Sequence, residues 1–204
     1  MATTSGSQQK TPRQRVPASE RRDALIEAAV AEFAHGGLYG TPVDKIARRV
    51  GVAQPYVFSL FGNKRELFLA AVTRSYERVG DIFTQAAEAF DPALALDDAT
   101  VLKAMGNAYV ELLNTNRDYL MIQHQAYAAC DDEVVREHVR NRYARLVAHV
   151  AALSDADAEE LDDFFRYGMW LNAAAAMGVE DLSAGCEWMR DEAKGDPEVP
   201  EGGD

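Results

Sequence analysis

The chain has 204 residues, of which 48% are hydrophobic and 26% charged, a composition typical of a folded globular protein. It has no apolar run long enough to cross a membrane, no secretory signal pattern, and two cysteines, too few for a disulfide framework, so we expect a cytoplasmic protein. The net charge of −12, taken alone, argues against a nucleic-acid partner.

The charge is distributed unevenly along the chain. Residues 1–80 hold twelve Lys/Arg and seven Asp/Glu, a net charge of +5, which leaves −17 for the rest. An asymmetry of this size favours a basic module joined to an acidic one. A single fold with an uneven surface is the alternative interpretation.

The N-terminal part predicts an arm followed by a first helix. Residues 1–18 are rich in Ser, Thr, Gln and Pro and hold no acid, so we expect a disordered basic arm. From there on, apolar residues recur at helical spacing. Ser19 suits the N-cap of the first helix, and His35-Gly36-Gly37 would close it.

Residues 41–61 predict two short helices joined by a tight turn. A threonine followed by a proline at positions 41 and 42 is typical of a helix start, with the hydroxyl as N-cap. Ala47, Gly51 and Val57 then supply a small residue at the helix crossing, a glycine at the turn and an apolar residue that packs inward. This spacing is that of a helix-turn-helix, although a plain helical hairpin would also satisfy it.

The second of these helices, over residues 54–61, has an outer face suited to DNA. With Val57, Leu60 and Phe61 packed inward, Gln54, Tyr56 and Ser59 would point outward. Their polar groups match base edges or phosphates, and Gln54 suits a base best.

The rest of the chain predicts further amphipathic helices and no β-rich segment. Asn63-Lys64-Arg65-Glu66 is a capping signature that opens a longer helix, and Ser154 with Asp157 resembles another. The remaining helical stretches are Thr100–Leu113, Arg117–Ala129, Asp132–Leu153, Asp155–Val179 and Leu182–Ala193. The fold class is therefore all-α.

At this point the sequence resembles the TetR family of bacterial transcriptional regulators. The stretches that carry the resemblance are Gly40-Thr41-Pro42-Val43-Asp44-Lys45-Ile46-Ala47, Gly51-Val52-Ala53-Gln54-Pro55-Tyr56 and Phe61-Gly62-Asn63-Lys64-Arg65-Glu66-Leu67-Phe68. They are similar to the family's second and third helices and to the entry of its fourth. The resemblance implies a recognition helix that binds DNA and a palindromic operator bound by a homodimer.

The resemblance assigns DNA contacts residue by residue. Gln54, Pro55, Tyr56 and Ser59 fall on the recognition helix, and Thr41 and Lys64 fall where the family touches phosphate. Lys45 and Arg49, on the preceding helix, would reach the backbone or a base. Arg13 and Arg15 would enter a minor groove as an arm. Two positions depart from the family pattern: Phe58 replaces a common tyrosine, and Ala53 replaces a common serine cap.

The acidic half predicts an interface and a cavity. Gly168, Asn172 and Ala175 share one helical face that would admit another helix, either of the same chain or, as the resemblance implies, of a second subunit. Thioethers, aromatic rings and a few polar groups mark candidate ligand contacts, with ordinary core packing as the alternative. These candidates are Met105, Tyr109, Met121, Gln125, Tyr127, Trp170 and Asn172.

The pattern favours a regulator over an enzyme. His124, His138 and His149 lack metal-ligand spacing, no catalytic constellation is evident, and we expect no metal, no cofactor and no membrane contact. The predicted domains are an arm over 1–18, a helix-turn-helix domain over 19–64, a helical regulatory and dimerisation domain over 65–194, and a flexible tail over 195–204.

The function predicted is a TetR-like repressor released from its operator by an unidentified small-molecule effector. Two alternatives stay open. One is an activator or a regulator controlled by a protein partner, with the same fold. The other is a helical ligand-binding module whose DNA-binding segment is vestigial.

Overall fold

The structure is a computed structural model that describes residues 17–93 and 100–178, which form eight helices and no strand. The helices are α1 (Ala18–Gly40), α2 (Val43–Val50), α3 (Gln54–Phe61), α4 (Lys64–Ala89), α5 (Val101–Thr115), α6 (Asp118–Ala128), α7 (Glu133–Ser154) and α8 (Ala158–Met177). The prediction of an all-α fold is confirmed. In the described residues, no helix combines the length and apolarity that crossing a membrane requires.

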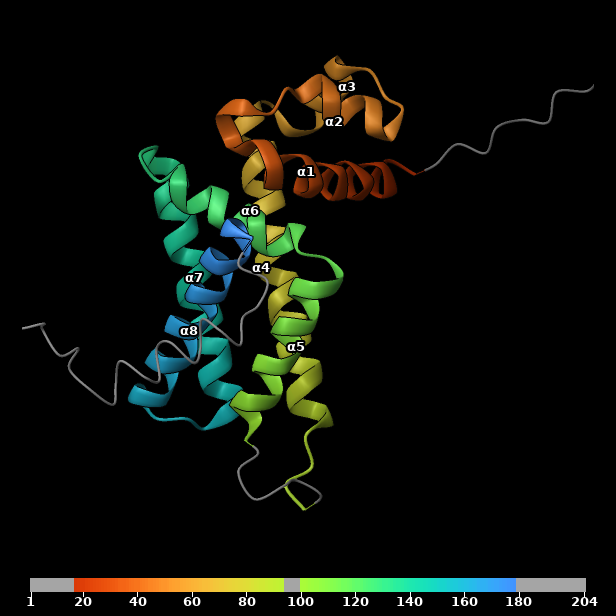
Figure 1. The fold of residues 1–204 in the computed structure, drawn as a ribbon. Helices are drawn as coiled ribbons and strands as arrows, with labels where there is room; N and C mark the ends of the chain where they lie inside the picture. The colour runs from red at the N-terminus through yellow and green to blue at the C-terminus, as the bar shows by residue number, and fades with distance from the viewer. Residues whose placement is uncertain (1–16, 94–99, 179–204) are drawn as a thin grey trace, which may run out of the picture.

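The helices form a small unit and a bundle. In Figure 1, α1, α2 and α3 lie together at one end of a bundle made by α4 to α8. The long helix α4 packs against α1 at that end and against α5, α6 and α7 farther along. It begins at the predicted domain boundary between residues 64 and 65, so a single rigid helix belongs to both units; the boundary itself stays a prediction.

Helix α1 differs from the prediction at both ends. Its N-cap is Pro17, and Ser19 lies within the first turn without capping it. The helix breaks at Gly37, whose φ of 61° and ψ of −176° are not helical, and then continues to Gly40. The break lies where the sequence predicted the end, but Leu38 packs into the core beyond it, and this burial favours the extra turn.

The core of the small unit rests on aromatic packing between α1 and α4. The rings of Phe33 and Phe68 meet edge to face with their centroids 5.0 Å apart, and both side chains are fully buried. Ile46 and Val57 complete this core from α2 and α3. The short helices are therefore held by burial on the scaffold of α1 and α4, because helices of eight residues are not stable alone.

The helix starts confirm one predicted cap and correct two. The Asn63 side chain accepts a hydrogen bond from the backbone of Glu66, as predicted. The capping box of α8 is formed by Asp157 with Glu160, whereas the Ser154 hydroxyl donates to a carbonyl within α7. Thr41 does not cap α2, whose N-cap is Pro42.

Several sequence predictions fall outside the described residues. These are the arm with Arg13 and Arg15, the helix predicted over Leu182–Ala193 and the tail over 195–204.

Candidate functional site: a helix-turn-helix and an internal cavity

The turn between α2 and α3 has the geometry that its sequence predicts. Gly51 ends α2 with a φ of 75°, a left-handed conformation that glycine adopts without strain, and its N–H donates back into α2. Ala47 and Val57 are each 1% exposed at the crossing of the two helices. The two helices are thus fixed at a crossing, with the outer face of α3 free.

The exposed face of α3 carries fewer free polar groups than expected. Gln54 and Pro55 are exposed, and the Gln54 side chain makes no hydrogen bond within the described residues. The Ser59 hydroxyl donates to the carbonyl of Tyr56 at 2.7 Å, and the Tyr56 ring is half-buried against the core. The N-cap residue Ala53 gives no side-chain cap. Gln54 is therefore the side chain best placed to read a base edge.

Two of the predicted DNA contacts are ion-paired to α1. The buried carboxylate of Glu32 accepts from Lys45 Nζ at 2.7 Å and from Arg49 Nη1 at 2.9 Å. The Lys45 hydrogen bond, supported by Arg49, lowers the pKa of Glu32 against the opposing effect of burial. The carboxylate thus positions both cations at the edge of α2, where each stays more than half exposed.

The two residues predicted to touch phosphate make contacts within the chain. The Thr41 hydroxyl donates to the Glu32 carbonyl at 3.2 Å, and the side chain is buried. Lys64 Nζ donates to the Tyr39 carbonyl at 3.1 Å, and burial lowers the pKa of its ammonium group. Thr41 thus bonds back onto α1 and Lys64 ties the start of α4 to the end of α1, and their contacts with DNA stay predictions.

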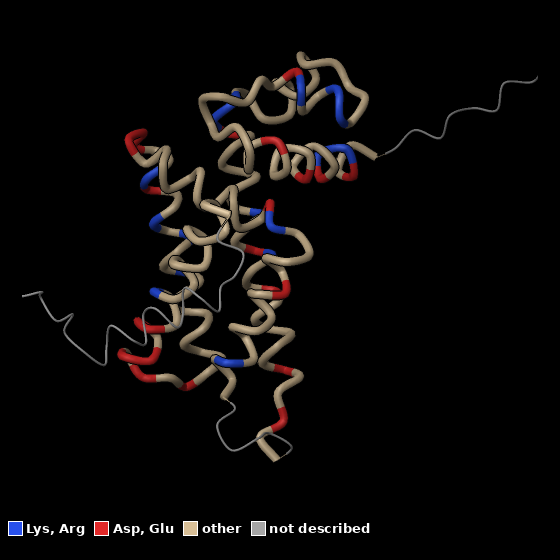
Figure 2. The backbone as a smooth tube through the Cα atoms, viewed as in Figure 1, with Lys and Arg blue, Asp and Glu red and all other residues tan. Residues whose placement is uncertain are grey.

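Figure 2 shows how the charges lie on the fold. Residues 17–64 hold six Lys/Arg and five Asp/Glu, so the described part of the helix-turn-helix unit is nearly neutral. The acids of residues 155–163 gather at the start of α8, at the end of the bundle away from α2 and α3 (Figure 2). The acidic cluster therefore lies at the end of the molecule opposite a helix-turn-helix unit that, in its described part, is nearly neutral rather than basic.

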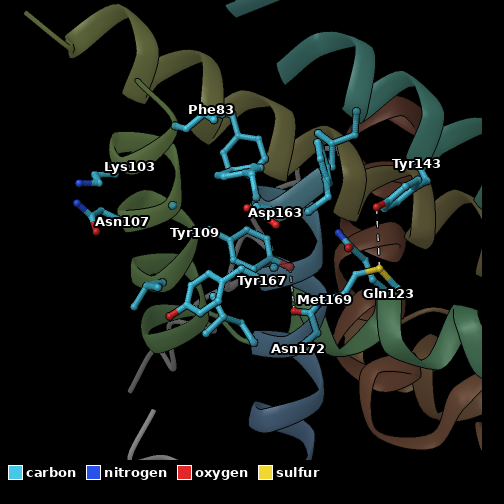
Figure 3. A pocket seen from close by; sticks show the side chains of 18 of the residues that line it. Phe83, Lys103, Asn107, Tyr109, Gln123, Tyr143, Asp163, Tyr167, Met169 and Asn172 are labelled. Atoms are coloured by element: carbon cyan, nitrogen blue, oxygen red, sulfur yellow. Dashed lines mark hydrogen bonds between the residues drawn. The ribbon is translucent and has the colours of Figure 1, made fainter. Parts of the chain in front are cut away.

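The bundle holds a partly open cavity of about 600 Å³, within the size range of small-molecule sites. Figure 3 shows side chains from α4 to α8 around it. Its walls include aromatic rings from all five helices, among them Tyr76, Phe83, Tyr109, Tyr127, Tyr143 and Phe164. Such a wall suits an apolar ligand.

Buried polar groups line one side of this cavity. The Tyr109 hydroxyl donates to Asn172 Oδ1 at 2.9 Å (Figure 3). A second series runs from the Tyr76 hydroxyl to that of Tyr127, and from Tyr127 to Gln123 Oε1, both at 3.4 Å. Burial raises the pKa of all three tyrosines, so their phenols stay neutral at physiological pH.

The structure brings three of the seven predicted ligand contacts to the cavity. Tyr109, Tyr127 and Asn172 line it, whereas the other four do not. Met105 is fully buried and Met121 half-buried in the core. Gln125 lies against Gly37 of α1. The Trp170 Nε1 atom is buried without a hydrogen-bond partner in the described residues. In residues 17–93 and 100–178, no group of His, Cys, Asp and Glu could hold a metal ion.

Sequence reasoning missed several wall residues that helical spacing alone could have found. Tyr76 and Phe83 are seven residues apart on α4, and Gln123 lies four residues before Tyr127 on α6, so each pair shares a face. The face of α8 predicted to admit another helix packs within this chain: Asn172 and Ala175 are buried, and Gly168 borders the cavity.

Helix α6 connects the cavity with the helix-turn-helix unit. Gln123 and Tyr127 line the cavity, while Tyr119 donates to Glu27 Oε2 of α1 at 2.6 Å. Asp118 lies 3.5 Å from the His35 ring on α1. A shift of α6 would therefore be passed directly to α1.

Together, the α2–turn–α3 geometry and the fold define a helix-turn-helix protein. The family described as bacterial regulatory proteins, tetR family, matches residues 25–71. The chain is 37% identical over 65 residues to the HTH-type transcriptional activator FasR of Mycolicibacterium smegmatis, over 32% of this chain and 30% of that protein. It is 38% identical over 50 residues to an HTH-type transcriptional repressor of Streptomyces coelicolor, over 24% of this chain and 26% of that protein.

The fold likeness extends farther than the sequence match. A TetR-like transcriptional regulator from Rhodococcus sp. RHA1 superposes with a TM-score of 0.57 at 23% identity, over 84% of this chain and 88% of that chain. The matched sequence spans less than a third of the length of the two curated regulators. Residues 25–71 are thus similar in sequence to the tetR family of bacterial regulatory proteins, and the fold of the chain is similar to that of a TetR-like regulator.

Proposed function

We propose that the protein is a ligand-responsive transcriptional regulator that binds a palindromic operator as a homodimer. The observation that carries this proposal is the presence of both an exposed α3 face and a partly open, aromatic-lined cavity, with α6 lining the cavity and packing against α1. A ligand-controlled switch requires a DNA-binding surface and a small-molecule site that are mechanically coupled.

On DNA, α3 would lie in the major groove. Gln54 would hydrogen-bond a base edge, with Pro55, Tyr56 and Ser59 beside it, since the glutamine amide is the unpaired polar group of this face. Lys45 and Arg49 would contact phosphate from the edge of α2, held in position by Glu32. Thr41 and Lys64 would brace the backbone contacts at the starts of α2 and α4. Arg13 and Arg15 lie outside the described residues.

Dimerisation would use the exposed apolar side chains of α8. Tyr167, Met169 and Met177 are 42%, 47% and 62% exposed, respectively, large values for apolar groups of this size. A twofold dimer would place two α3 helices on one face of DNA, about one helical turn apart. Sedimentation of the purified chain should give the mass of two copies at micromolar concentration, and a monomer would contradict the dimer.

A ligand in the cavity would act on DNA binding through α6. Helix α6 carries two residues of the cavity wall, Gln123 and Tyr127, and also Tyr119, which contacts α1. A ligand that moves Gln123 and Tyr127 would therefore change the position of α1. The effect is reciprocal: if the ligand weakens DNA binding, DNA must weaken ligand binding by the same factor. The relatives named above include one activator and one repressor, and our proposal is a repressor released by its ligand.

The decisive experiment is selection of bound fragments from genomic DNA, followed by affinity measurements with Gln54→Ala. We expect the variant to lose about tenfold in affinity for the selected site, because one base contact is worth about 1–3 kcal/mol, and to keep its nonspecific affinity. Gln85→Ala, an exposed glutamine far along α4, is the matched control and should change neither. No enriched site, or full specificity in Gln54→Ala, would contradict the proposal. A reporter gene behind the selected site then separates repression from activation.

A further inference from the structure

The wall of the cavity indicates the shape of what it binds. The ring of Phe83 meets that of Phe164 edge to face at a centroid distance of 5.5 Å, and it is tilted by 32° against the ring of Tyr109 at 6.0 Å. These rings present flat faces and edges to the cavity, and such surfaces stack best on another ring. A planar ring system therefore fits the wall better than a flexible chain.

The charges around the cavity exclude an anionic group from its interior. In the described lining, the only cation is Lys103, which is exposed, and Figure 3 shows its amine pointing away from Tyr109 and Asn172. Glu160 and Asp163, also exposed, add negative charge to the lining. A carboxylate inside would be desolvated without a cationic partner, which is costly.

The polar groups of the wall call for a hydrogen-bond acceptor. The Tyr109 hydroxyl donates to the amide oxygen of Asn172. The NH₂ group of the same amide points away from Tyr109 and makes no hydrogen bond within the described residues. An NH₂ group donates but cannot accept, which favours a carbonyl oxygen over an ammonium group as its partner. The 3.4 Å contacts of Tyr127 are longer than a normal O–H···O bond, so this phenol is also available to a ligand.

We propose that the cavity binds an uncharged ring compound that bears a carbonyl group, and that the Asn172 amide donates to that carbonyl. This inference rests on the proposed function, since the compound would be the effector that controls DNA binding. It assigns Asn172 as the residue that selects the ligand and Tyr109 as the residue that orients its amide.

The test uses four probes that share a naphthalene ring: acetylnaphthalene, ethylnaphthalene, naphthoate and naphthylmethylammonium. Calorimetry on the full chain should show that the ketone and the hydrocarbon bind, and that the two charged probes bind about tenfold or more weakly than the ketone. Tightest binding of naphthoate, tightest binding of the ammonium probe, or no binding of the ketone would overturn the proposal.

Matched variants locate the carbonyl contact. Asn172→Leu keeps the side-chain size and should lower the affinity for the ketone about fivefold, which corresponds to the loss of one hydrogen bond. The affinity for ethylnaphthalene should not change. Because this change leaves the Tyr109 hydroxyl unpaired, the double variant Tyr109→Phe/Asn172→Leu removes both partners and should restore stability but not ketone affinity. Equal losses for both probes would overturn the role of Asn172. Lys103→Gln should leave the ketone affinity unchanged; a loss would place the carbonyl at the lysine instead.

The outcomes separate this inference from the proposed function. If acetylnaphthalene binds through Asn172 without altering operator affinity, the ligand class holds and effector control fails. If naphthoate binds through Lys103 and releases DNA, effector control holds and the ligand class is wrong.

Discussion

At the edge of the hydrophobic core that joins α1, α2, α3 and α4, ion pairs link the helices, whereas the hydrogen bonds between helices at the cavity join uncharged side chains. Glu32 pairs with Lys45 and Arg49 in the first region, while in the second Tyr109 and Asn172 form a bond between uncharged groups. Ion pairs respond to pH and salt, and neutral aromatic packing responds to apolar solutes. We therefore expect pH and salt to act mainly on the helix-turn-helix end of the molecule, and apolar ligands to act mainly on the cavity.

Removing one buried ring in each region should produce the largest losses in the free energy of unfolding. Phe68→Ala should lower the free energy of unfolding by about 4 kcal/mol, since the ring is fully buried between α1 and α4. Phe83→Ala should cost about 3 kcal/mol or less, because its ring already borders empty space. Urea denaturation measures both. Equal losses would show that the cavity wall is packed as tightly as the core of the helix-turn-helix unit.

The break in α1 should be the next most sensitive position. Gly37→Ala forces a side chain into a left-handed φ, and the added carbon would lie 2.6 Å from Gln125 Oε1, so we expect a loss of about 2 kcal/mol. Gly40→Ala is the matched control, because it meets open space at an ordinary φ, and should stay within about 0.5 kcal/mol of wild type. Thermal and urea unfolding test the pair. A neutral Gly37→Ala would mean that α1 can straighten.

Replacing the buried carboxylate of Glu32 should remove a pH-dependent part of the stability of the charged region. Glu32→Gln should cost about 2 kcal/mol at neutral pH by removing two charged hydrogen bonds. Because the folded protein lowers the pKa of Glu32, its stabilisation is complete above the ordinary value of 4.5 and is lost as the pH falls through the lower, folded value. Unfolding curves from pH 7 to pH 3 should therefore converge for the two proteins. Glu20→Gln, an exposed control, should show no such convergence.

The smallest expected change in the free energy of unfolding concerns Arg74, and it should come with a change in how strongly a cavity ligand affects DNA binding. Arg74 of α4 pairs with Asp23 and Glu27 of α1, and Glu27 also accepts from Tyr119 of α6. Arg74→Gln should cost about 0.5 kcal/mol, as surface ion pairs do, yet reduce the effect of a cavity ligand on DNA affinity. Paired operator titrations with and without ligand measure this. Arg78→Gln is the control, and an unchanged ligand effect in Arg74→Gln would move the coupling elsewhere.

The helix-turn-helix could be predicted from sequence because its geometry is encoded locally. Ala47, Gly51 and Val57 lie within eleven residues, and each is demanded by the turn itself. Contacts from farther away were not accessible to this reasoning. Thr41 was expected as a cap, but the carbonyl of Glu32, nine residues earlier, takes its hydroxyl instead.

The cavity could be predicted only in part, because its wall is assembled from five helices. Composition marks Met105 and Tyr109 equally, yet one side chain fills the core and the other faces the cavity. The two residues are four apart on α5 and share a helix face, so the difference between them depends on the side chains that neighbouring helices, far along the chain, pack against each one. Asn172 was named as one of the few polar groups among thioethers and aromatic rings, and the structure places it on the cavity wall, hydrogen-bonded to Tyr109.

The Glu32 cluster also bears on how the protein would search a genome. Because Glu32 offsets one of the two positive charges of Lys45 and Arg49, this cluster would attract phosphate less than two free cations, and an encounter with an unrelated sequence should be brief. Firm attachment would require the two cations to share their carboxylate with the DNA backbone, which only a well-docked α3 would allow. The Glu32 carboxylate would in this way shorten the time spent on nonspecific DNA and so speed the search for the operator.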